Sequence, residues 1–142
     1  MIASSTRALS RVLVVSGLGL VALTGCSQQG DAAEAAQQYV TGTYQSQCEM
    51  THPSRGEAAK DCQDADTETV WPGHPTEVTE TVKWGDGYAV TIPDEDGTKD
   101  VFGMLDHDGE WKVAEFDIID AEDELTDNPA CAALNQDGQE TC

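Results

Sequence analysis

Two glutamates are placed among apolar side chains by the alternation of the strands predicted around them. Glu80 shares its strand face with Trp84, and Glu115 has the same parity as Trp111. A carboxyl group that faces an apolar cavity titrates with a raised pKa, which is the property that general acid–base catalysis requires. We therefore predict Glu80 and Glu115 as candidate pocket residues, and no catalytic residue. The alternative is a strand bulge or an open sheet end that exposes both to water.

The three histidines are the other groups suited to proton transfer or metal binding. His52 and His74 adjoin prolines, and His107 lies inside a predicted hairpin turn. Such positions favour exposure to solvent, so we predict three exposed loop histidines without a role in acid–base chemistry. The sequence predicts no metal site and no cofactor.

Two acidic clusters offer hard oxygen ligands of the kind that Ca²⁺ prefers. They are Asp94-Glu95-Asp96 and the pair Asp106 and Asp108. Neither belongs to a twelve-residue loop with a distal glutamate, the pattern of an EF-hand. Both adjoin Asp-Gly dipeptides, so we interpret them as turns.

The first 25 residues have the organisation of an export signal. Arg7 and Arg11 precede residues 12–23, which carry no charge. A run of this length is too short to span a bilayer, which takes about 20 residues, but it suits the core of a signal peptide. The run ends in Leu23-Thr24-Gly25-Cys26, which resembles the lipobox of bacterial lipoproteins at all four positions.

This resemblance implies that Cys26 is acylated. Its thiol would receive a diacylglycerol with chains such as palmitate, and cleavage after Gly25 would make Cys26 the first residue of the mature protein. Two acyl chains anchor a protein stably. We expect a signal peptide over residues 1–25, a short tether over 26–30, and a protein that is lipid-anchored to the cell membrane on its extracytoplasmic side. A transmembrane anchor or a chance cysteine is the alternative.

The cysteine count agrees with export. Five is an odd number, but assigning Cys26 to lipid leaves Cys48, Cys62, Cys131 and Cys142, an even set. Disulfides persist outside the cytoplasm, and four cysteines allow three connectivities. We favour the local pairs Cys48–Cys62 and Cys131–Cys142. Zinc is the competing use, but the closely spaced cysteine or histidine pairs of zinc sites are missing from the sequence.

The charge balance limits the partners. The chain has 27 acidic and 7 basic residues, a net charge of −20, and loss of residues 1–25 with their two arginines makes it −22. A nucleic-acid partner is excluded because it needs a clustered basic surface. The acidity indicates a solvated surface, adaptation to high salt, or a field that attracts cations or a basic protein.

The periodicity predicts helices first. Asp31 and Glu34 form a capping-box pattern at the start of a helix that continues to Cys48. A second, shorter helix runs from Ser54 to Cys62, and residues 63–76 form a loop.

Alternating strands follow. They are predicted over residues 77–84, 88–92, 101–105 and 111–119, and Asp-Gly turns separate them. Asn128-Pro129 starts a last short helix that ends at Gly138, or else this region is an acidic tail. The fold class is therefore α+β, with a helical hairpin packed on a four-stranded antiparallel meander.

This order of elements resembles the nuclear transport factor 2-like (cystatin-like) superfamily, and in particular its small bacterial envelope lipoproteins. The residues that carry the resemblance are Ala35-Ala36-Gln37-Gln38-Tyr39-Val40, Tyr44 with Cys48, Thr51-His52-Pro53, Cys62, and Asp108-Gly109-Glu110-Trp111-Lys112-Val113. The resemblance implies a domain over residues 31–120 in which a curved, cone-like sheet wraps the helices and leaves a pocket. Residues 121–142 would then form an acidic, disulfide-bridged tail.

These observations lead to three functional hypotheses. The first is a lipid-anchored, non-enzymatic binding or accessory module of the cell envelope, with an envelope protein or a small molecule as its partner. The second is an acidic inhibitor or immunity-type protein that blocks a basic envelope enzyme by charge complementarity. The third is an isomerase or hydratase that uses Glu80 and Glu115 in the cone pocket.

Overall fold

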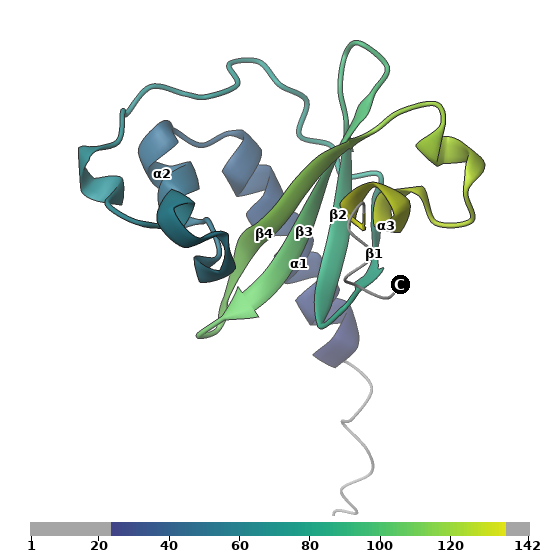
Figure 1. Cartoon of the computed structure of the whole chain (residues 1–142), viewed down its shortest axis with the longest axis horizontal. Coiled ribbons are helices and arrows are strands. Elements are labelled where there is room, and N and C mark those ends of the chain that lie inside the picture. The colour runs from purple at the N-terminus through teal and green to yellow at the C-terminus, as the bar shows by residue number, and fades with distance from the viewer. Residues whose placement is uncertain (1–23, 136–142) are drawn as a thin grey trace, which may run out of the picture.

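The computed structural model describes residues 24–135, which form an α+β fold with an open four-stranded antiparallel sheet (Figure 1). This confirms the predicted fold class. The elements are the helices α1 (Thr24–Val40), α2 (Tyr44–Glu49) and α3 (Pro129–Leu134), the 3₁₀ helices η1 (Pro53–Ala59), η2 (Cys62–Asp64) and η3 (Asp123–Leu125), and the strands β1 (Glu80–Trp84), β2 (Gly87–Pro93), β3 (Lys99–His107) and β4 (Glu110–Ile119). Residues 1–23, most of the predicted signal peptide, lie outside the described residues.

Short turns set the order of the sheet. Each strand pairs with the next one along the chain, so the sheet order is β1-β2-β3-β4. Gly85, Gly97 and Gly109 have φ angles of 51°, 93° and 87° at the three hairpin turns. Such angles strain a residue with a Cβ but not glycine, which is why Gly-containing turns connect these strands. The four predicted strands and their turns are confirmed.

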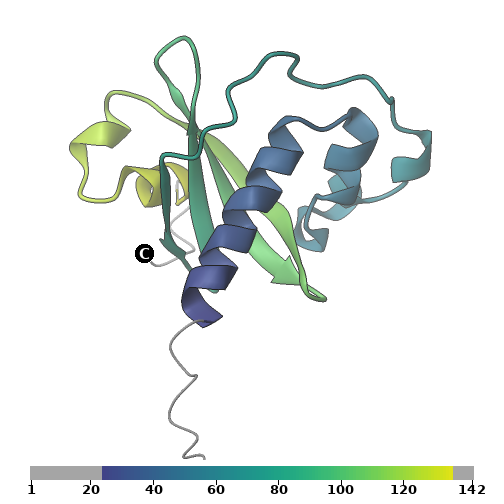
Figure 2. The ribbon, with the colours of Figure 1, turned by 180° about the vertical axis from the view of Figure 1, so that it is seen from behind.

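Helices cover both faces of the sheet. Figure 2 shows α1 crossing one face diagonally, and α3 lies against the opposite face (Figure 1). On the α1 side, Ala32, Ala36 and Val40 repeat at helical spacing and are fully buried against the sheet. Phe102 and Met104 of β3 belong to the same cluster.

The C-terminal part of the described chain covers the second face of the sheet. Asn128 caps α3 by accepting the N–H of Cys131 at 3.3 Å, and proline opens the helix, as the sequence predicted. Ala130 and Ala133 of α3 are buried with Trp84, whose indole N–H donates to Asn135 Oδ1 at 3.3 Å. The helix ends at Leu134, before the predicted end at Gly138, which lies outside the described residues.

The helical region differs from the prediction in three ways. Helix α1 begins at Thr24, so Asp31 is an internal helical residue and not its N-cap, and residues 26–30 of the expected tether are helical. The helix ends at Val40, because Thr43 adopts extended backbone angles and caps the separate helix α2 by accepting the N–H of Ser46. The described helices include none that is long and apolar enough to cross a membrane.

The predicted second helix is wrong. Residues 53–64 form the two 3₁₀ helices η1 and η2, which contain no buried residue. Gly56 has a φ of 61° and a ψ of −120°, angles that interrupt a regular helix. Without an apolar stripe to bury, the segment gains little from forming an α-helix.

One predicted disulfide is confirmed. Cys48 at the end of α2 is bonded to Cys62 at the start of η2, with their Cα atoms 5.4 Å apart. The other predicted bridge includes Cys142, which lies outside the described residues, so it stays a prediction.

Gly30 offers a test of the helical assignment of the expected tether. It lies in α1, is exposed, and has no heavy atom within 4 Å of the position of an added Cβ. Gly30→Ala should raise the free energy of unfolding by about 0.5–1 kcal/mol, because alanine is the better helix former. Urea denaturation followed by tryptophan fluorescence measures the change.

The matched control is Gly87→Ala. A Cβ at Gly87 would lie 1.8 Å from the carbonyl oxygen of Met104 on the neighbouring strand, so this variant should lose about 2 kcal/mol. A loss of stability in Gly30→Ala would show that residues 26–30 are not helical.

Candidate functional site

The two predicted pocket glutamates are both exposed and do not share an enclosed cavity. Glu80 is the first residue of β1, at the open end of the sheet, and borders a shallow hollow beside Ala33 of α1. Glu115 directly follows a β-bulge, since Gly103 pairs with Glu115 while Met104 pairs with Val113. The alternative weighed from the sequence, a sheet end and a bulge, describes both positions.

A groove between α1, the end of α2 and the start of β4 is a candidate binding site. Its volume is about 420 Å³. The residues that line it are Asp31, Glu34, Ala35, Gln38, Glu49, Met50, Glu110, Trp111 and Lys112. The α1 members are three or four residues apart, so they form one face of the helix. The groove therefore lies where this face of α1 passes beside the start of β4.

The groove is acidic with an aromatic floor. Four of its lining side chains are carboxylates and one is a lysine. Lys112 is already engaged, because its Nζ donates to the Glu49 carbonyl oxygen at 2.9 Å and lies 3.3 Å from Glu110 Oε2. Trp111 is partly buried and meets Tyr88 edge-on, with 5.5 Å between the ring centroids. Carboxylates around an indole are suited to an ammonium or guanidinium group.

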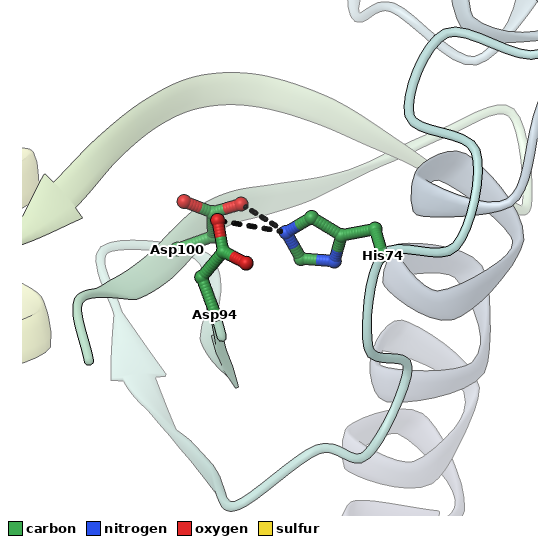
Figure 3. Close-up of side chains that lie close together, drawn as sticks. All are labelled: His74, Asp94 and Asp100. Carbon is green, nitrogen blue, oxygen red and sulfur yellow. Dashed lines mark hydrogen bonds and ion pairs between the residues drawn. The ribbon is translucent and has the colours of Figure 1, made fainter. Parts of the chain in front are cut away.

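A second cluster, separate from the groove, lies at the turn between β2 and β3. His74 precedes β1, Asp94 directly follows β2, and Asp100 is the second residue of β3. The Nε2 atom of His74 lies 2.9 Å from Asp100 Oδ2 and 3.7 Å from Asp94 Oδ2. Figure 3 shows the two carboxylates pointing toward the same ring nitrogen. One ring nitrogen and two carboxylate oxygens from three separate segments therefore lie close together.

This cluster is largely shielded from water. The side chains of His74 and Asp100 are 8% and 9% exposed, and that of Asp94 is 35% exposed. Burial raises the pKa of the Asp100 carboxyl, an effect opposed by His74 and reinforced by the neighbouring Asp94. On the inner side the His74 ring packs on Trp71, with 5.8 Å between their centroids.

The aromatic core holds this loop in place. Trp71 lies within 6.4 Å, centroid to centroid, of Tyr39, Phe102 and Phe116. Aromatic pairs at such distances stabilise beyond the area they bury. Residues 65–79 otherwise carry neither helix nor named strand, so Trp71, together with the hydrogen bond from Gln37 Nε2 to the Thr76 carbonyl oxygen at 2.7 Å, anchors the segment that contains His74.

The expectation of three exposed histidines is wrong for His74, whose side chain is largely buried. His52 and His107 are more exposed than His74. His107 has 43% of its side chain exposed. His52 caps η1 by accepting the N–H of Ser54, and burial, followed by the charges of His107 and Lys112, lowers the pKa of its imidazole.

Both acidic clusters form turns, as interpreted from the sequence. Asp96 Oδ1 accepts the N–H of Thr98 at 2.9 Å, and Asp106 Oδ1 accepts the N–H of Gly109 at 3.3 Å. Asp94 has a further contact that the turn did not predict, the one with His74. A contact between residues 74 and 94 depends on the path of a long loop, and no local pattern reveals that path.

Comparison with known proteins gives no relative. The chain matches no protein-family model, and neither the curated proteins nor the solved structures searched include a similar chain.

Proposed function

We propose that this protein is a lipid-anchored, non-enzymatic binding module on the extracytoplasmic side of the cell membrane, and that its acidic groove binds a cationic group of an envelope partner. The observation that carries the proposal is the groove itself. Its lining contains four carboxylates and one lysine, and that lysine is already engaged, so the net negative charge of the lining favours an added positive charge.

The position of the groove fits an anchor at Cys26. The lipobox resemblance places the acylated residue at the beginning of α1, and the described helix is continuous from Thr24 to Val40. With a rise of 1.5 Å per residue, the groove residues Asp31 to Gln38 lie about 8–18 Å along the helix from Cys26. A rigid helix of this kind would hold the groove close to the membrane, where it meets membrane-bound partners.

The cationic ligand class follows from the lining. A lysine or arginine side chain, or an organic amine, places its charge among carboxylates and its alkyl part against an indole and a thioether, those of Trp111 and Met50. The high negative charge of the whole chain would speed the approach of such a partner.

Two further elements of the proposal concern fold and export. We propose a divergent member of the nuclear transport factor 2-like superfamily with a cone-like sheet, supported by the order of N-terminal helix, helical segment and antiparallel meander. The Cys48–Cys62 disulfide supports an oxidising compartment, and the pair Cys131–Cys142 is proposed with it.

The inhibitor hypothesis is a special case of the same site. It requires that the cationic partner be a basic envelope enzyme whose activity falls on binding. Co-purification of such an enzyme, with release at raised salt, would select this version.

Charge reversal in the groove tests the binding function. Glu34 is exposed on α1, and Glu34→Lys places a positive charge within the lining. We expect this variant to bind a triarginine peptide about tenfold more weakly than the unchanged full-length chain in detergent, because one attraction becomes a repulsion. Isothermal titration calorimetry at physiological salt measures the affinity.

The control has the same change of charge outside the groove. Glu122 is exposed in the segment before η3, and Glu122→Lys should leave the affinity nearly unchanged at this salt concentration. Equal weakening in both variants would mean that the peptide responds to total charge, and the groove would lose its role.

A further inference from the structure

The His74, Asp94 and Asp100 cluster has the composition and geometry of a metal site. A neutral imidazole nitrogen and two carboxylate oxygens are ligands that zinc accepts. The three ligand atoms all lie within 4.8 Å of one another. We propose that this cluster binds one zinc-class divalent transition-metal ion, at a site separate from the acidic groove.

The ring orientation of His74 supports metal binding. Its Nδ1 lies 2.7 Å from the carbonyl oxygen of Pro75, and a carbonyl only accepts, so Nδ1 carries the proton that it donates. In the neutral ring, Nε2 then has a lone pair, and this lone pair faces the two carboxylates. Histidines that bind metals are held in this way, with the second nitrogen donating to a carbonyl or a carboxylate.

The spacing of the donor atoms fits one small ion. Two atoms that share a tetrahedral zinc at about 2.1 Å lie about 3.4 Å apart. The separations from His74 Nε2 to Asp100 Oδ2 and to Asp94 Oδ2, 2.9 and 3.7 Å, fall on either side of this value. Only small shifts would let one ion replace the direct contacts.

The carboxylate of Asp94 is oriented by its own turn. Its Oδ1 accepts the N–H of Glu95 at 2.6 Å, which leaves Oδ2 directed at His74. Asp100 is fixed within β3, where its backbone pairs with Ile92 and Ile118. Two ligands on opposite sides of one hairpin and a third on an anchored loop form a preorganised site.

The charges at the site favour a cation. Among the described residues, neither Asp94 nor Asp100 forms an ion pair with a lysine or an arginine, and the nearby Lys99 pairs with Glu124. Two carboxylates therefore meet at a partly buried point with a single imidazole as their partner, and a divalent ion there would balance their charge.

The surroundings indicate zinc over calcium and allow access. Calcium takes six to eight oxygen ligands, which this site does not supply, whereas zinc accepts three protein ligands and an outer water. A hollow of about 280 Å³ opens beside His74 and Asp94, and Glu95 lines it as well. An ion can therefore enter from solvent and keep a water ligand on that side.

Zinc titration of the full-length chain, purified in detergent without a histidine tag, tests the site. We expect one equivalent of Zn²⁺ to bind, with a rise in the melting temperature, and millimolar Mg²⁺ or Ca²⁺ to compete poorly. Asp94→Asn removes a ligand at a partly exposed position and keeps an oxygen for the Glu95 N–H. It should weaken zinc binding at least about tenfold. His74→Gln should abolish the binding, provided that its circular dichroism shows a folded chain.

The control is His107→Gln, which removes a half-exposed histidine outside the cluster and should bind zinc as the unchanged chain does. The proposal is overturned if the unchanged chain binds no stoichiometric zinc. It is equally overturned if Asp94→Asn binds as tightly as the unchanged chain, or if Mg²⁺ displaces zinc at equal concentration. In the first two cases a proton alone links His74 to Asp100, and in the third the site has no preference for a zinc-class ion. None of these outcomes depends on whether the groove binds a peptide, so the zinc site and the groove are tested independently.

Discussion

Cells that produce the Cys26→Ser variant should have the protein in the soluble fraction, whereas the unchanged chain should sediment with membranes. The hydroxyl of serine replaces the thiol that the lipobox resemblance assigns as the acylation site. Each buried methylene contributes about 0.8 kcal/mol to membrane binding, so the loss of two acyl chains should lower the membrane partition by far more than a hundredfold. Fractionation and immunoblotting measure the distribution.

The described residues, 24–135, offer little to replace the lipid. No described helix meets the length and hydropathy of a membrane span, and a chain of net charge −20 is repelled by anionic lipid. Ser27→Ala is the control, because it changes the next residue and leaves the thiol in place. Release of both variants would indicate a fractionation artefact, and membrane retention of Cys26→Ser would refute lipid anchoring at this residue.

The strands were predictable because their signals are local. Side-chain alternation and three Asp-Gly or Gly-containing turns define each hairpin within about ten residues. The turn after β3 shows the reason, since Asp108 and Gly109 both have positive φ angles, 56° and 87°. Such angles favour Asp-Gly over most other pairs, and the dipeptide can be read from the sequence.

The limits of the helices were less predictable. The apolar spacing continues through Gly42 toward Cys48, but Thr43 caps a new helix there. A periodic pattern reports which residues face the core and not whether the backbone turns between them. Likewise, Ser54 and Glu57 have the spacing of a capping box, but η1 and η2 contain no buried residue and no α-helix forms there.

The candidate sites depend on contacts between distant segments. The groove joins α1 to the start of β4, and the metal-site candidate joins His74 to Asp100, 26 residues further along the chain. The sequence contained one partial signal. Trp71 is a large apolar residue in an otherwise polar loop, and such a residue indicates a loop that is anchored to the core. It does not indicate which side chain the anchored loop presents.

Loss of the Cys48–Cys62 disulfide should have the second large effect. The loop that it closes spans 14 residues of sequence separation, for which the chain-entropy model gives about 3 kcal/mol of stability. We expect the double variant Cys48→Ser/Cys62→Ser to lose about this amount in urea denaturation. That is a large part of the stability of a domain of this size.

The loop closed by the disulfide makes few other contacts with the fold. Much of the lost stability should therefore be lost locally, in this loop. Of residues 49–61 only Thr51 is buried. The hydrogen bonds between these residues and the sheet are three: the His52 N–H donates to the Val113 carbonyl at 2.8 Å, the Val113 N–H donates to the Met50 carbonyl at 2.9 Å, and Lys112 Nζ donates to the Glu49 carbonyl at 2.9 Å. Without the disulfide, residues 53–64 should therefore detach more often than the sheet unfolds.

Trypsin reports this detachment directly. Arg55 and Lys60 lie in the closed loop, whereas the other basic residues of the described chain are Lys83, Lys99 and Lys112, all on strands. Cleavage after Arg55 and Lys60 should become at least about tenfold faster in the double variant, since 1.4 kcal/mol of local stability corresponds to a factor of ten. Cleavage at the strand lysines should change less. Cys48→Ala/Cys62→Ala is the control for the added hydroxyls and should behave alike.

The same variant links the disulfide to the groove. Glu49 and Met50 directly follow Cys48 and form one wall of the groove, so a detached loop leaves this wall without its support. Triarginine affinity should fall in the double variant. Adding Glu34→Lys to the double variant should then weaken binding by a smaller factor than it does in the unchanged chain. Retained affinity, together with unchanged tryptic rates, would mean that the hydrogen bonds of Val113 and Lys112 suffice to hold the wall and that the disulfide adds nothing to the folded site.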